Sequence, residues 1–322
     1  MMVNTSGVPD VHNHSRTTGV SMLKKYLINW QLYMFLLPSV VYIILFAYIP
    51  MAGIQIAFKN YNFNLGIWGS HWIGLTEFRR FFSSYMFARI LWNTISLSFY
   101  GLIAGFPLPI LLALLINSFP GAHYKKLVQS VSYMPHFISM VVVVGMLVQL
   151  FNPRAGAVGA IYQLLTHNVM PDILGNPGAF QHLYVWSGVW QGTGWGSIIY
   201  IAALSGVDEE LHEAAQIDGA GRFQRVLHID LPSIMPTATI MLILSAGNIM
   251  NVGFEKTFLM QNSLNIRVSE VISTYVYKVA MTIGTGDFSY ATAIGLFNSV
   301  INFLLLVFVN SASKKLSDTS LW

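Results

Sequence analysis

The chain has 322 residues, of which 54% are hydrophobic and only 9% are charged. Soluble domains carry about 25% charged residues, so this composition excludes a water-soluble globular protein and predicts one embedded in lipid. The absence of cysteine excludes disulfides and cysteine-ligated metal sites, and the basic residues behind the net charge of +4 are too scattered for a nucleic-acid partner.

The first part of the chain, residues 1–25, is polar and is followed by a long apolar stretch. It lacks the apolar core and the small-residue cleavage site of a secretory signal peptide. We therefore expect residues 1–25 to form a disordered cytoplasmic tail.

Six apolar stretches follow, each long enough to cross a hydrocarbon core of about 30 Å. They are apolar on every face, whereas barrel strands alternate between apolar and polar residues. We predict an all-α integral membrane protein with a transmembrane domain at 26–312 and a cytoplasmic tail at 313–322. The six predicted transmembrane helices are Gln31–Gly53, Leu91–Asn117, Val131–Phe151, Leu183–Ser205, Ile234–Val252 and Tyr290–Asn310.

Glycines recur along the fourth predicted span at Gly192, Gly194 and Gly196. Small residues let helices approach closely in a membrane, so we expect these glycines to form a packing face. A nucleotide-binding loop is the weaker interpretation, because no strand precedes the run.

The outer segment 152–180 joins the third and fourth predicted spans and is too long for a bare connector. We expect an apolar stretch at 157–165 to form a short helix on the membrane surface. The alternative is a structured loop without a partner.

The most polar long stretch of the ordered chain is the loop 206–233, between the fourth and fifth spans. Asp208 is placed to cap a helix over 209–217, and Gly219 can take the positive φ that ends it. A second short helix follows, with apolar residues at helical spacing at Phe223, Val226, Leu227 and Leu231. Two short helices with a break could dock into a groove of another protein; an ordinary solvated loop is the alternative.

This loop resembles the coupling loop of the permease subunits of ABC importers. The likeness rests on residue types at fixed spacing, from Glu213-Ala214-Ala215 through Gly219 to Leu231-Pro232. It implies that the loop is cytoplasmic and sits in a cleft of a separate ATPase subunit. The residues that it assigns to ATPase coupling are Glu213, Ala214, Ala215, Asp218, Gly219, Phe223, Leu231 and Pro232.

The likeness extends over nearly the whole chain, including Trp72–Phe78, Asn93-Thr94, Ala202–Leu204 and Tyr290–Gly295. Its C-terminal part resembles permeases for polysaccharides and uronic-acid oligosaccharides, among them alginate oligosaccharide. The resemblance implies a multi-pass protein of the bacterial inner membrane with both termini cytoplasmic. It also implies four kinds of partner besides lipid: an ATPase dimer, a second related permease in a heterodimer, an extracytoplasmic solute-binding protein and the oligosaccharide. The solute-binding protein would contact the outer segment 152–180.

No phosphate-binding G-x-x-x-x-G-K-[ST] motif is present, so the chain itself is not expected to hydrolyse ATP. We expect it to be a non-catalytic subunit that binds no cofactor or metal, with ATP and magnesium held by the partner ATPase subunits. The alternative function is a secondary transporter or channel for a small polar solute, which would place ionisable residues inside its spans.

A sugar path through the membrane needs amide and aromatic side chains at membrane depth. The alternative roles of these side chains are interfacial anchors for the aromatic residues and interhelical hydrogen bonds for the asparagines. Lys256 or Lys278, both in an outer loop, could attract an acidic substrate or could be solvated charges. The candidates for the substrate path are Trp190, Gln191, Trp195, Tyr200, Asn248, Asn251, Asn298 and Asn302.

Overall fold

The computed structural model describes residues 30–281 and 286–316, so the predicted N-terminal tail and residues 317–322 lie outside the described residues. The chain forms two compact units, residues 1–54 and 55–322. The described part of the first unit is helical from Trp30 onward. Its elements are α2 (Trp30–Ile43), the π-helical turn η1 (Ile44–Tyr48), α3 (Ile49–Met51) and the start of the 3-10 segment η2 (Ala52–Phe58).

The π-helical turn η1 comes directly before a proline in this first helical run. Pro50 has no N–H to donate to the preceding turn, and its ring crowds the carbonyl four residues earlier. The N–H of Ile49 donates to the carbonyl of Ile44, five residues back, which widens the turn at that point. The run Trp30–Phe58 is nevertheless long and apolar enough to cross a membrane, as predicted for Gln31–Gly53.

The second unit begins with a small hairpin and two short helices. Its strands β1 (Lys59–Asn60) and β2 (His71–Trp72) pair antiparallel around α4 (Gly66–Gly69), and α5 (Thr76–Phe82) follows. The ammonium of Lys59 lies 4.9 Å from the centre of the Trp72 ring and donates to the carbonyl of Ile67 at 2.7 Å, which explains its burial. No other strand is present among the described residues of this unit.

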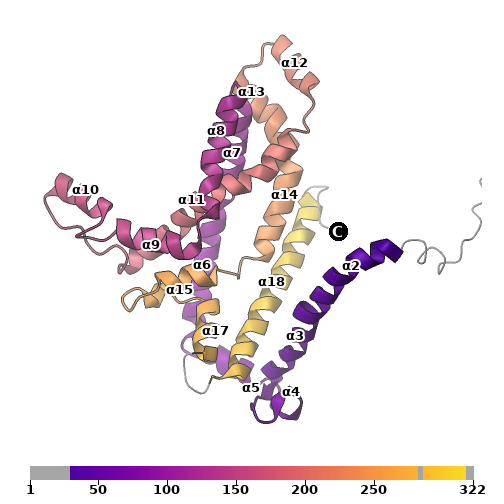
Figure 1. Ribbon diagram of the computed structural model, residues 1–322, viewed down its shortest axis with the longest axis vertical. Coiled ribbons are helices and arrows are strands. Elements are labelled where there is room, and N and C mark those ends of the chain that lie inside the picture. The colour runs from indigo at the N-terminus through magenta and orange to yellow at the C-terminus, as the bar shows by residue number, and fades with distance from the viewer. Residues whose placement is uncertain (1–29, 282–285, 317–322) are drawn as a thin grey trace, which may run out of the picture. The chain divides into compact units, whose positions relative to one another are not determined.

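Three helices of this unit pack against one another. The helices α6 (Phe87–Gly105) and α7 (Pro107–Ser118) make a nearly continuous apolar run of 32 residues, which covers the second predicted span. The long helix α11 (Pro177–Leu204) packs against both of them (Figure 1). It covers the fourth predicted span.

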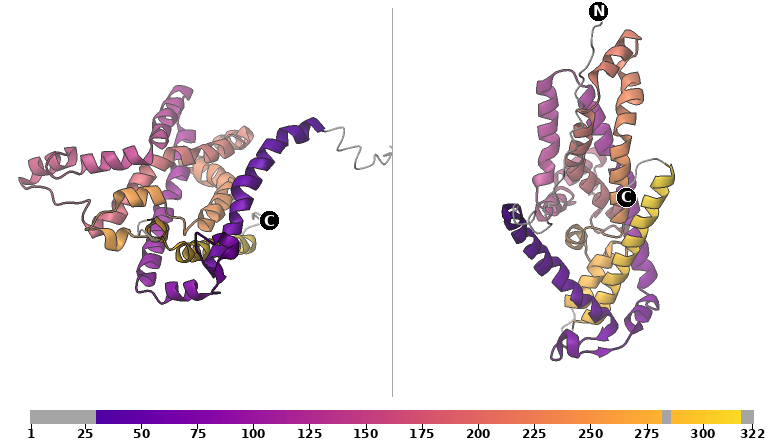
Figure 2. Two further views of the ribbon diagram at one scale, coloured as in Figure 1. Left: turned by 60° about the horizontal axis from the view of Figure 1, so that its bottom comes forward. Right: turned by 90° about the vertical axis from the view of Figure 1, so that its right-hand side faces the viewer.

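The third predicted span, Val131–Phe151, is wrong as a single helix. The structure has α8 (Ala122–Tyr133), the 3-10 turn η3 (Met134–Phe137) and α9 (Met140–Leu150), with a bend of 95° at the break. Pro135 cannot donate a backbone hydrogen bond, and Ser139 begins a new helix by accepting from the N–H of Val142. As a result α9 and the following α10 (Ala157–Thr166) project sideways from this unit in Figure 1 and in the left view of Figure 2.

The remaining helices lead from the polar loop to the C-terminus. The helix α14 (Leu231–Gly247) lies beside α18 (Phe288–Leu316), and a Cβ at Gly247 would collide with the side chain of Leu306. The fifth predicted span, Ile234–Val252, extends past the end of this helix, which stops at Gly247. Three short helices connect α14 to α18: α15 (Phe254–Met260), α16 (Ile266–Ser269) and α17 (Ile272–Met281).

Four runs among the described residues are long and apolar enough to cross a membrane, and a fifth is added if the bent pair of α8 and α9 counts as one. The helix α11 is not among them, because its glycines and polar side chains lower its hydropathy. The prediction of a mostly helical membrane protein is confirmed in this coarser form. The four runs are Trp30–Phe58, Phe87–Ser118, Arg222–Gly247 and Phe288–Lys315.

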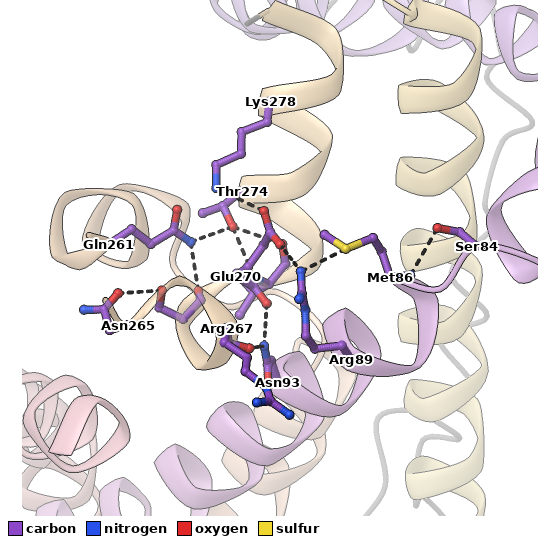
Figure 3. A network of polar contacts seen from close by, with 12 residues as sticks. Ser84, Met86, Arg89, Asn93, Gln261, Asn265, Arg267, Glu270, Thr274 and Lys278 are labelled. Carbon is purple, nitrogen blue, oxygen red and sulfur yellow. Dashed lines mark hydrogen bonds and ion pairs between the residues drawn. The ribbon is translucent and has the colours of Figure 1, made fainter. Parts of the chain in front are cut away.

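A buried polar network fastens α6 to α16 and α17 (Figure 3). The carboxylate of Glu270 accepts from Arg89 at 2.9 Å and from Lys278 at 3.0 Å. The amide of Asn93 donates to the backbone carbonyls of Arg267 and Glu270 at 3.0 and 2.9 Å. Lys278 is thus bound to Glu270. One of its two predicted roles was a solvated charge, and this ion pair contradicts it.

The predicted glycine face of α11 differs from one glycine to the next. A Cβ at Gly194 would collide with the carbonyl oxygen of Ser132 in α8, whereas a Cβ at Gly192 would meet nothing within 4 Å. We expect Gly194→Ala to destabilise the protein by about 1–3 kcal/mol through overpacking, and Gly192→Ala to be neutral or slightly stabilising. Thermal unfolding of the two purified variants in detergent measures this difference. Equal shifts in their midpoints would contradict the close contact at Gly194.

Candidate functional site: a polar hairpin and a cavity

The first part of the site is a helical hairpin formed by α12 (Glu209–Ile217) and α13 (Arg222–Arg225). The carboxylate of Asp208 accepts from the N–H of Glu210 at 3.0 Å and so caps α12. At the other end Gly219 has a φ of +82°, and the N–H of Ala220 donates to the carbonyl of Ala215 at 2.8 Å. These are the features of a Schellman ending, so both the predicted cap and the predicted stop are confirmed.

The apolar residues of the hairpin point in two directions. Val226 and Leu231 pack toward the core cluster of the neighbouring helices, whereas Phe223 is 77% exposed and Leu227 is 45% exposed. The prediction of one apolar face across these four residues is therefore wrong. A π-helical turn, η4 (Val226–Asp230), contains Val226 and Leu227 and shifts the register of Leu231, which follows it.

The hairpin lies at one end of the second unit, with α12 at its tip (Figure 1). Ile217, at the end of α12, is 87% exposed. Most of the eight residues that the resemblance assigned to ATPase coupling are exposed, while Ala215 and Leu231 are partly buried. The exposed ones are Glu213, Ala214, Asp218, Gly219, Phe223 and Pro232.

A buried aspartate holds the hairpin to the bundle. Asp230 is 3% exposed, and its Oδ1 lies 3.3 Å from Nε2 of His212 in α12 and accepts from Nδ2 of Asn117 in α7 at 3.3 Å. The three side chains join the hairpin, the start of α14 and the end of α7. Sequence reasoning missed them, although a lone acid within the apolar run Val226–Leu231 was a usable signal.

The second part of the site is a cavity of about 530 Å³, lined by residues of α6, α7, η3, α9, α11 and α15. Its polar lining includes His136, Gln191, Thr193 and Lys256. Gln191 donates to the backbone carbonyl of Ile138 at 2.8 Å, and the indole of Trp195 stacks on His136 with ring centres 4.5 Å apart. Two of the predicted path residues, Gln191 and Trp195, thus belong to this cavity and its immediate support.

The other predicted aromatic residues of α11 border different cavities. Trp190 lines an apolar cavity of about 380 Å³ together with Trp186. Tyr200 is buried and lines a smaller cavity that shares Gly105 and Pro109 with the polar one. The predicted aromatic set is therefore spread along α11.

The four predicted asparagines lie together where α14 ends against α18. Asn298 donates to Oδ1 of Asn251 at 3.1 Å, and Asn251 donates to Oδ1 of Asn248 at 3.3 Å. Asn302 accepts from the backbone N–H of Met250 at 2.9 Å. The predicted spacing of Asn248 and Asn251 on one helical face is wrong, since the helix stops at Gly247. Their contact is a hydrogen bond outside the helix.

Lys256 is not the solvated loop residue that was one of its two predicted roles. It lies on α15, is 4% exposed and lines the polar cavity. Its Nζ donates to the carbonyl of Tyr184 at 2.7 Å and lies 4.7 Å from the centre of that residue's ring. Burial lowers the pKa of Lys256 to about 8, so the side chain is mostly charged at neutral pH.

Comparison with known families decides what kind of protein carries these features. Residues 105–318 match the family described as "Binding-protein-dependent transport system inner membrane component". This chain belongs to that family. The prediction of a permease subunit of an ABC importer in the inner membrane is thereby confirmed.

Two relatives of this permease come from Bacillus subtilis (strain 168). It is 40% identical over 304 residues to protein LplB, covering 94% of this chain and 95% of LplB. It is 39% identical over 301 residues to the polygalacturonan/rhamnogalacturonan transport system permease protein YteP, covering 94% of this chain and 93% of YteP.

The permease also resembles a chain of a solved transporter. That chain comes from the crystal structure of a bacterial alginate ABC transporter in complex with an alginate pentasaccharide-bound periplasmic protein. The two superpose with a TM-score of 0.84 at 36% identity, covering 93% of the permease and 99% of that chain.

The described residues of the permease contain no group of three or more His, Cys, Asp or Glu side chains that could hold a metal ion.

Proposed function

We propose that this permease forms the transmembrane path of an ATP-driven importer for an oligosaccharide, and that the hairpin of α12 and α13 is its docking element for a separate ATPase. The observation that carries the proposal is the hairpin itself. It combines a fixed bend at Gly219 with two large apolar side chains, Ile217 and Phe223, that none of the described residues of the second unit covers. Two large exposed apolar side chains in an otherwise polar loop support a contact with another protein.

The hairpin is built to pass a movement on to the membrane helices. The turn η4 continues from α13 into α14 without a break, and Asp230 ties α12 to α7 through His212 and Asn117. A displacement of α12 by an ATPase would therefore act on α7 and α14 together. ATP and magnesium would stay on the ATPase subunits, and this chain would supply no catalytic group.

The proposed topology has six spans with both termini in the cytoplasm. The bent pair of α8 and α9 and the glycine-rich α11 would supply the two spans that length and hydropathy leave open. The hairpin would then face the cytoplasm, and α10, which carries the exposed apolar residues Leu164 and Leu165, would lie on the outer side near a solute-binding protein.

The substrate class rests on the relatives and on the cavity. YteP is named for polygalacturonan and rhamnogalacturonan, and the similar structure holds an alginate pentasaccharide on its periplasmic protein. The cavity offers an amide, a hydroxyl and an imidazole in Gln191, Thr193 and His136, groups that can hydrogen-bond to sugar hydroxyls. A solute-binding protein would deliver the oligosaccharide, and a second, related permease would complete the path.

The docking role can be tested at Phe223. We expect Phe223→Asp to weaken the binding of the ATPase subunits several-fold, because a charge replaces an apolar contact worth about 1–2 kcal/mol. Co-purification of the ATPase with the tagged permease in detergent measures the effect. Leu164→Asp is the matched control, because Leu164 is equally exposed, at 77%, but lies on α10. Equal retention of the ATPase by the two variants would contradict the docking role of the hairpin.

A further inference from the structure

A buried cation faces the polar cavity without an acidic partner. Lys256 belongs to none of the ion pairs formed among residues 30–281 and 286–316. None of the residues that line the cavity is acidic, and the neighbouring Glu255 on α15 is exposed. An ammonium has three donors, and the carbonyl of Tyr184 uses one of them.

Such an arrangement is costly unless something compensates for the charge. Removing an ammonium from water costs several kcal/mol, and one backbone carbonyl with one aromatic ring offsets only part of this. A buried ionisable side chain that faces a cleft is a candidate functional-site residue, and a ligand could supply the missing negative charge. The wall of the cavity also makes room for the ammonium, because a Cβ at Gly188 would lie 3.0 Å from Nζ of Lys256.

We propose that Lys256 binds a carboxylate of the transported saccharide, so that the cavity selects acidic, uronate-containing oligosaccharides over neutral ones. This inference rests on the proposed import function and names the substrate class of the same cavity. Lys256 would pair with the carboxylate, while Gln191, Thr193 and His136 would contact hydroxyl groups of the sugar. A lysine that only stabilised the bundle by bonding to Tyr184 would affect acidic and neutral sugars alike.

The test uses an acidic substrate and its neutral methyl ester, which share the same sugar chain. The complete transporter, with its ATPase, partner permease and binding protein, is reconstituted in liposomes. Uptake is measured for trigalacturonate and for its fully methyl-esterified, neutral form. We expect Lys256→Met to lower the ratio of acid to ester uptake about tenfold, the value of one charge-assisted hydrogen bond. The same binding protein serves every variant, so its own preference cancels from the comparison.

Two further variants keep the test decisive. Gly188→Ala should lower the same ratio by crowding the ammonium, even if Lys256→Met fails to assemble. Lys278→Met removes a lysine that is bound to Glu270 outside the cavity, and it should leave the ratio unchanged. A ratio that stays constant in both cavity variants, or a wild-type transporter that prefers the ester or imports neither substrate, overturns the inference. Co-purification with the ATPase, measured separately, decides the proposed function.

Discussion

Gly219→Val is expected to lower ATP-driven uptake roughly thirtyfold while the transporter still hydrolyses ATP. Gly219 has a φ of +82°, and a β-branched residue in that conformation costs about 2–3 kcal/mol. The strain is relieved if the chain unwinds the hydrogen bonds that end α12, and α13 then takes a new direction. An ATPase could still bind α12, but its movement would no longer reach α14.

The control for this experiment is Gly219→Asn, because asparagine accepts the left-handed conformation far better than valine does. A Cβ at this position would meet nothing within 4 Å, so the two variants differ in backbone strain and not in crowding. Uptake and ATP hydrolysis are measured in the same proteoliposomes. Normal uptake by the valine variant would show that the bend at Gly219 does not carry the coupling.

The hairpin could be predicted from the sequence because its signals are local. A capping aspartate at 208 and a glycine at 219 act on backbone groups within a few residues of themselves, and the structure has both. The direction of the apolar side chains could not be predicted in the same way. It depends on the π-helical turn at 226–230, which no propensity of these residues indicates.

The features that depend on distant contacts were harder to predict from the sequence. The bend between α8 and α9 lies within a run that hydropathy shows as one apolar stretch. Lys256 looks like a solvated charge in a loop, and the packing of α15 against α9 and α11 buries it. The asparagines were found by residue type. The sequence does not indicate that Asn251, which follows the end of α14, bonds to Asn298 of α18, 47 residues further along the chain.

The pairing of Glu270 is a second case of a contact that only the fold creates, and it leads to the largest expected loss of stability. The carboxylate is 5% exposed and accepts from both Arg89 and Lys278. We expect Glu270→Gln to lower the free energy of unfolding by about 3 kcal/mol, since removing one member of a buried ion network leaves the others uncompensated. The value lies at the low end of the usual range, because both cations keep partial contact with solvent. Equilibrium unfolding of the permease in mixed detergent micelles measures it.

Two further variants separate the lost charge from lost packing. Glu77→Gln breaks a pair whose arginine, Arg80, is 55% exposed, and such pairs contribute only about 0–1 kcal/mol. Replacing Glu270, Arg89 and Lys278 together by methionine should cost less than Glu270→Gln alone, because no buried charge is then left without a partner. If the triple variant were instead the least stable, the network would act through packing and hydrogen bonds to the backbone. The charge balance around Glu270 would then not be what holds α6 to α17.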